Sequence, residues 1–140
     1  MENRVNDAVK LFEEGFACSQ AVFAAFSDRY GVDKNTALKI ASGFGGGIAR
    51  KQEVSGAVSG AIMLIGCRDG KTDSNDQIAQ KKTYENVESF CQKFVERNNS
   101  ITCSKILGCD MPTAKERGLF GTLCTKCVRD AAEIVSEILE

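Results

Sequence analysis

The sequence predicts an all-α protein, a single-domain bundle of about six helices spanning residues 1–140. Apolar residues recur at three- and four-residue spacing in several segments, which is typical of the buried face of a helix. Residues that cap helices precede these segments and glycines follow them. With 140 residues, the chain is long enough to bury a core without disulfide bonds.

Two helices are expected in the N-terminal region. Asn6 can cap the first helix, and Gly15 is placed to end it. The second helix begins near Ala17, carries a periodic apolar face and ends at Gly31. Cys18 is therefore expected in the first turn of this second helix.

A third helix, capped by Asp33, is expected to run through Ala41 into a glycine cluster, residues 43–47, that breaks regular structure. Residues 56–66 are almost all apolar and indicate a central, buried helix. Their glycines and alanines form a small-residue face that another helix can approach closely. At about 12 residues, this segment is too short to span a bilayer.

The second half of the chain begins with polar residues 68–76, which predict a loop, and continues with an amphipathic helix over residues 77–97. The apolar face of this helix is expected to carry Tyr84, Val87, Cys91, Phe94 and Val95.

Two shorter patterns complete the bundle. Ser100 can cap a short helix that Gly108 ends, with Cys103 near its third position. Thr122 or Thr125 can cap the last helix.

The charge balance argues against two classes of partner. Eighteen basic and 19 acidic residues give a net charge of −1, so neither nucleic acid nor an anionic membrane is an expected partner. The N-terminal residues lack a signal-peptide pattern, and no stretch approaches the roughly 18 apolar residues of a membrane span. We expect a cytoplasmic protein.

Seven cysteines and no histidine narrow the chemistry. Without histidine there is no imidazole general base, no Ser–His–Asp triad and no histidine-ligated zinc or haem. In a reducing cytosol, this number of cysteines favours metal ligation or redox chemistry over structural disulfides.

Cys124 and Cys127 form a CxxC pair immediately before the last helix. A thiol at a helix start lies near the positive end of the helix dipole, which lowers its pKa. We expect the pair to cycle between dithiol and disulfide. In the alternative interpretation, one cysteine lies beside the cap and the other is buried as a small apolar residue.

Three cysteines, Cys18, Cys103 and Cys124, are thus expected near helix N-termini, and Ser55 lies at a fourth. If these four helix starts converge, they form a pocket that favours thiolates or a bound anion.

The other cysteines have simpler interpretations. Cys91 is expected in the core, and Cys67 and Cys109 are expected to be incidental thiols. Cys109 could also resolve a sulfenic acid formed at Cys103.

The glycine cluster could bind an anion through its backbone N–H groups, with Arg50 and Lys51 beside it. It lacks the spacing of a nucleotide-binding loop, and a turn that lets helices approach closely is the alternative. The cofactor is unknown; the candidate cofactor-binding residues are Gly45, Gly46, Gly47, Ser55 and Gly56.

Over nearly its whole length, the chain resembles the C-GCAxxG-C-C family of redox-active proteins. The resemblance rests on residues 16–22 around Cys18, residues 42–47 and 53–60, residues 100–103, and Cys124 ahead of residues 128–132. It implies a helical protein with redox-active cysteines, but it defines neither substrate nor cofactor.

One position departs from the family motif. Residues 55–60 read Ser-Gly-Ala-Val-Ser-Gly, so Ser55 stands where the motif has cysteine. Serine forms no disulfide and is a poor metal ligand, which puts any mechanism that needs all four thiols in question. Cys127 is better placed than Cys67 to compensate.

Three hypotheses follow. The first is a thiol redox protein, a homodimer with an unidentified redox partner, in which Cys124 and Cys127 exchange electrons while Cys18 and Cys103 take part. The second is a metal or iron–sulfur protein with these four cysteines as ligands. The third is a binding module in which the helix of residues 56–66 forms a dimer interface or lines a ligand pocket.

Overall fold

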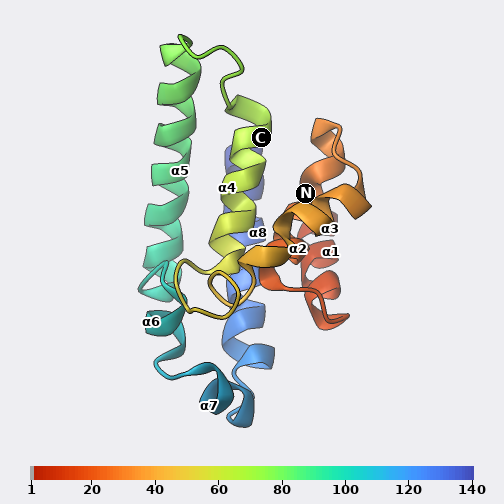
Figure 1. Ribbon diagram of the computed structural model, residues 1–140, viewed down its shortest axis with the longest axis vertical. Coiled ribbons are helices and arrows are strands. Elements are labelled where there is room, and N and C mark those ends of the chain that lie inside the picture. The colour runs from red at the N-terminus through yellow and green to blue at the C-terminus, as the bar shows by residue number, and fades with distance from the viewer. Residues whose placement is uncertain (1) are drawn as a thin grey trace.

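The computed structural model describes residues 2–140 and confirms the all-α class (Figure 1). The described residues form no β-strand, and their one isolated bridge joins Val54 to Thr102. The helices are α1 (Glu2–Glu13), α2 (Cys18–Phe26), α3 (Lys34–Ala41), α4 (Gly56–Asp69), α5 (Gln77–Asn98), α6 (Cys103–Leu107), α7 (Met111–Glu116) and α8 (Thr125–Leu139).

The expected number of about six helices is too low, since residues 2–140 contain eight. The sequence analysis missed α7, a single short segment between α6 and α8. Two residues at its start are typical of a helix N-terminus. The side chain of Asp110, the N-cap, accepts a hydrogen bond from Thr113 N, and Pro112 lies in the first turn.

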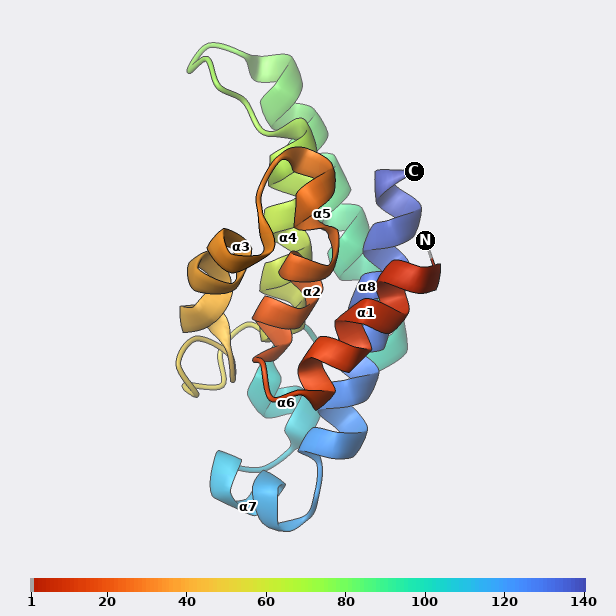
Figure 2. The ribbon, with the colours of Figure 1, turned by 90° about the vertical axis from the view of Figure 1, so that its right-hand side faces the viewer.

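The long helices α4, α5 and α8 pack against one another. Helices α1 and α2 pack on α4 and α8, on the side away from α5 (Figures 1 and 2). The core between them contains the fully buried side chains of Val22, Phe26, Val58, Leu64, Ile65, Phe90, Phe94, Val128, Ile134 and Val135.

Helix α4 lies very close to α2, and its glycines are the reason. A Cβ atom on Gly60 would lie 2.7 Å from the Ser19 carbonyl oxygen, and one on Gly56 would lie 2.5 Å from the Cys18 sulfur. Ser19 also donates a 2.7 Å hydrogen bond to the Ala41 carbonyl, which joins α2 to the end of α3. The small-residue face is therefore covered by α2 within the chain.

The buried face of α5 differs in part from the expected one. Phe90, which the sequence analysis left out, is fully buried and stacks on Phe94 with ring centroids 5.9 Å apart. Tyr84 and Val95 are 66% and 39% exposed. They lie about a third of a turn away from the Phe90–Phe94 line, at roughly 100° per residue.

Several helix boundaries were predicted well and others were not. Asp33 caps α3 through a hydrogen bond from Thr36 N, as expected. Asn6 caps nothing, because α1 already begins at Glu2. The expected loop at 68–76 begins too early, because α4 continues to Asp69.

The end of α4 is held by a buried carboxylate. Arg68 donates two hydrogen bonds to Asp69, and Asn86 of α5 donates a third. These contacts explain why Arg68 and Asp69, which were predicted to belong to the polar loop, are helical.

Within residues 2–140, none of the helices has the length and apolar character needed to cross a membrane.

The close packing of α2 against α4 can be tested by replacing two glycines of α4, one that contacts α2 and one that does not. We expect Gly60→Ala to destabilise the protein by about 1–3 kcal/mol, because the added methyl group meets the α2 backbone. Gly66→Ala, also in α4, meets no atom within 4 Å and should stabilise it by about 0.5–1 kcal/mol. Urea denaturation measures both, and equal stability of the two variants would contradict this packing.

Candidate functional site

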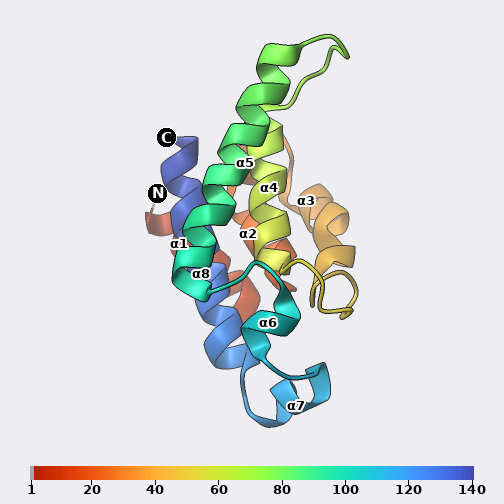
Figure 3. The same ribbon diagram turned by 90° about the vertical axis from the view of Figure 1, so that its left-hand side faces the viewer.

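A cavity of about 540 Å³ opens where the N-terminal ends of α2 and α4 meet α6, α7 and the start of α8. Figure 3 shows α6 beside the loop that precedes α4. All nine candidate residues line this cavity: Cys18, Gly45, Gly46, Gly47, Ser55, Gly56, Cys103, Cys124 and Cys127.

Cys18 is the first residue of α2, in the turn where the sequence placed it. Its sulfur lies against Gly56, where any Cβ atom would collide with it. Burial raises the pKa of the Cys18 thiol, although backbone N–H groups of Gly46, Ser19 and Ala57 act in the opposite direction. The starts of α2 and α4 therefore do converge on this sulfur.

Cys103 is the first residue of α6 and is 9% exposed. Its N–H donates a 2.7 Å hydrogen bond to the Glu53 carbonyl, which ties α6 to the segment before α4. The expected cap is wrong, since Thr102 occupies the N-cap and Ser100 Oγ accepts a hydrogen bond from Thr102 N. Burial, followed by the charge of Cys18, raises the pKa of Cys103 to about 11.

Cys124 directly precedes α8, as the sequence predicted, but the chain ahead of it is already helical, which the sequence did not indicate. It ends a single π-helical turn, residues 120–124, that runs directly into α8. Its N–H is bonded to the Leu119 carbonyl at 3.1 Å, and neither Thr122 nor Thr125 caps α8: the hydroxyl of Thr125 donates to the Phe120 carbonyl. The positive end of a helix dipole is therefore missing at this thiol.

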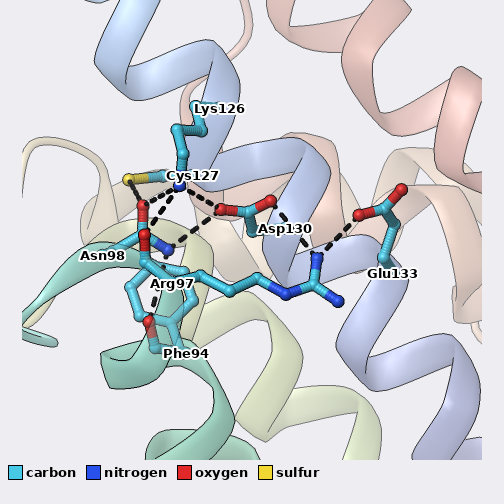
Figure 4. A network of polar contacts seen from close by, with 7 residues as sticks. All are labelled: Phe94, Arg97, Asn98, Lys126, Cys127, Asp130 and Glu133. Atoms are coloured by element: carbon cyan, nitrogen blue, oxygen red, sulfur yellow. Dashed lines mark hydrogen bonds and ion pairs between the residues drawn. The ribbon is translucent and has the colours of Figure 1, made fainter.

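Cys127 lies one turn further along and is 4% exposed. Its thiol donates a weak 3.7 Å hydrogen bond to Asn98 Oδ1, at the end of α5 (Figure 4). The Asn98 amide is held in this orientation, because Lys126 donates to Oδ1 and Nδ2 donates to Asp130. Nothing in the sequence indicated Asn98, which is 29 residues away.

The low thiol pKa values expected from helix starts are wrong. Burial, followed by negative charge on neighbouring thiols, raises the pKa of both Cys124 and Cys127 to about 12. The charge of Cys18 acts on Cys103, Cys124 and Cys127 alike. Cys18 is thus close to the other three, and the four sulfurs are neutral thiols near pH 7.

The loop before α4 has an unusual backbone. The residues from Gly46 through Arg50 all have positive φ, between 49° and 70°. Left-handed backbone costs about 1–2 kcal/mol for each non-glycine residue, and this stretch includes the β-branched Ile48. Hydrogen bonds from Gln52 N to Gly46 O and from Glu53 N to Gly47 O close the turn at 3.0 and 2.9 Å.

The glycines of this loop allow close contacts, which confirms that part of the prediction. A Cβ atom on Gly45 would lie 2.6 Å from Ala17 Cβ, and one on Gly47 would lie 2.9 Å from Cys103 Cβ. The loop is thereby pressed against both α2 and α6.

The remaining cysteines lie outside the cavity. Cys91 packs against the main core, Cys109 packs against the small cluster around α6 and α7, and Cys67 is exposed. All seven cysteines are free.

The four-thiolate ligand set of the second hypothesis is not preformed. Within residues 2–140, no three or more Cys, Asp or Glu side chains are arranged to hold a metal ion.

Comparison with known proteins gives one match. A family model described as "Putative redox-active protein (C_GCAxxG_C_C)" matches residues 16–138. No curated protein and no solved structure matches the chain. The matched segment contains every thiol that lines the cavity, and it covers most of the chain; the protein therefore belongs to the C-GCAxxG-C-C family of redox-active proteins.

Proposed function

We propose that this protein is a thiol redox protein that exchanges electrons by dithiol–disulfide exchange at the cavity. The observation that carries the proposal is the arrangement of Cys18, Cys103 and the CxxC pair around one space. These thiols come from three segments far apart in sequence, and membership of a redox-active family supports the same chemistry.

Cys124 and Cys127 form the exchanging pair in this proposal. On a helix, residues three apart have Cβ atoms about 5–6 Å apart, and a disulfide requires about 3.8 Å. The π-helical turn that ends at Cys124 supplies a place where the backbone can adjust. Local movement of this turn brings the two sulfurs within bonding distance.

The surroundings of the pair assign different roles to the two thiols. Asn98 Oδ1 accepts the Cys127 S–H, and a hydrogen bond from the neutral form keeps that thiol protonated. Cys124 therefore attacks the partner's disulfide first, and one partner sulfur leaves as a thiol. Cys127 then attacks the mixed disulfide, releases the second partner thiol and completes the Cys124–Cys127 bond.

Cys18 and Cys103 assist this exchange. Cys18 is the thiol that acts electrostatically on the other three, and backbone N–H groups of two helices and the loop act to lower its pKa. It is therefore the position best prepared to accept transient negative charge. In the GCAxxG motif of the family, cysteine directly precedes alanine, so Gly56, and not Ser55 as predicted, stands at that position in this chain. We propose that Cys127 supplies the fourth sulfur.

The raised pKa values indicate the direction of electron flow. A dithiol whose thiolates are stabilised is a strong oxidant, because its reduced form is favoured. Here burial disfavours the thiolates, so the pair is expected to donate electrons. A cytoplasmic location belongs to the same proposal, since a reducing compartment regenerates such a dithiol. The homodimer stays a prediction.

The first test counts reversibly oxidised thiols. We expect Cys124→Ser to lower the count by one pair, because Cys127 then lacks its partner. Differential alkylation before and after reduction, read by mass spectrometry, gives the number. Cys67→Ser and Cys91→Ser are matched controls outside the cavity and should leave it unchanged. An unchanged count in Cys124→Ser would refute the exchanging pair.

The second test is a pH titration of thiolate absorbance. In the folded protein, Cys103, Cys124 and Cys127 should ionise near pH 11 to 12, whereas in denaturant they should ionise near their ordinary pKa of about 9. The folded state binds these protons more tightly, so its stability should fall as pH rises from about 9 towards the folded pKa values. Ionisation of these thiols below about pH 8 in the folded protein would contradict the burial effect.

A further inference from the structure

We infer that the cavity binds a small organic disulfide that carries a carboxylate, and that Arg50 is the residue that recognises the anionic group. This inference rests on the proposed thiol exchange and names its substrate class.

The burial of the thiols restricts the size of the substrate. Cys103 and Cys127 are 9% and 4% exposed, Cys18 and Cys124 are partly buried, and all four line the cavity. A small disulfide reaches recessed sulfurs of this kind more readily than a disulfide held in a folded protein. A volume of about 540 Å³ falls within the usual range for small-molecule sites, about 300–1,000 Å³.

The lining of the cavity restricts the chemistry of the substrate. Its walls are largely apolar, with aromatic and aliphatic side chains from Phe12, Phe16, Ile106, Leu107, Met111 and Phe120. Among the described lining residues, Arg50 alone carries a formal charge, and no carboxylate faces it across the cavity. An apolar body with an anionic group fits this lining, whereas a cationic group finds no counter-charge.

Arg50 is held at the cavity by the left-handed loop. Its φ is 67°, and its N–H donates a 3.1 Å hydrogen bond to the Gly45 carbonyl. A Cβ atom on Gly46 would lie 2.9 Å from Arg50 Cα and 3.0 Å from Arg50 Cγ. The backbone and the first part of the Arg50 side chain therefore lie directly on Gly46, where any other residue would collide with them.

The guanidinium of Arg50 is available for a ligand. Within residues 2–140 it takes part in none of the ion pairs, which engage Arg4, Arg68, Lys81, Lys82, Arg97 and Lys126. A planar guanidinium can hold a carboxylate through two parallel hydrogen bonds. Strain in this loop thus serves to place one cation at the cavity entrance.

The reaction balances with the named oxidant. The Cys124 thiolate attacks one sulfur of the small disulfide R–S–S–R, the S–S bond breaks, and one RS⁻ leaves and takes up the proton lost by Cys124. Cys127 then attacks the mixed disulfide and releases the second RSH. The protein dithiol loses two electrons and two protons, and the small disulfide becomes two thiols.

The test compares two small aromatic disulfides, one anionic and one uncharged. Dithiobis(nitrobenzoate) carries a carboxylate on each ring, and dithiodipyridine is uncharged. Rates with the reduced full-length protein are divided by the rate of each probe with glutathione, which removes their intrinsic difference. We expect Arg50→Gln to slow the anionic probe about tenfold, the effect of losing one charge-assisted contact, and the neutral probe less than about twofold.

Matched variants separate this contact from general charge and from folding. Lys51→Gln removes the neighbouring positive charge, which does not line the cavity, and should leave both rates within about twofold of the wild type. Arg50→Gly relieves the left-handed backbone at this position and should lose the anion preference while remaining folded.

The outcomes distinguish failure of the proposed thiol exchange from failure of the inferred substrate class. If dithiodipyridine produces no disulfide among the cavity cysteines by mass spectrometry, the thiol exchange itself fails. If that disulfide forms but Arg50→Gln leaves the ratio of the two rates unchanged, the exchange stands and the substrate class is wrong. Oxidation by native insulin as fast as by the small probes would also overturn the inference, since a folded protein disulfide would then reach the thiols.

Discussion

The contact between α2 and α4 is the constraint on which the rest of the molecule depends. Gly56 and Gly60 lack the side chains that would separate the two helices, so backbone and sulfur of α2 lie directly on α4. This contact encloses the Cys18 sulfur between two helix starts and fixes one wall of the cavity. In this chain Gly56 and Gly60 are therefore packing residues, and Gly56 lies directly on the sulfur of Cys18 from another helix.

Burial, more than helix-start electrostatics, sets the protonation of the thiols. Backbone N–H groups do reach Cys18, but removal of the sulfurs from water has the larger effect at each of the four positions. At Cys124 the helix continues backwards as a π-helical turn, so no dipole end offsets the burial. The resulting site holds neutral thiols in a largely apolar cavity.

The left-handed loop connects this chemistry to recognition. Three non-glycine residues adopt positive φ between Gly47 and Lys51, an arrangement that costs energy and must be held by its surroundings. The hydrogen bonds that close the turn and the contacts of Gly45 with α2 and Gly47 with α6 hold it. One loop therefore contributes an N–H group to Cys18, a wall to Cys103 and a cation to the cavity entrance.

The sequence by itself determined the all-α class, the Asp33 cap and most of the helix at Gln77–Asn98, because periodicity and capping are local properties. It also indicated nine of the residues that line the cavity, in part through the family resemblance. Tertiary structure decided the rest. The thiol pKa values depend on burial among distant segments, the hydrogen bond of Cys127 to Asn98 joins two helices, and the exposure of Tyr84 depends on which side of α5 meets α4. Such properties arise only when segments distant in sequence pack together, so no local pattern records them.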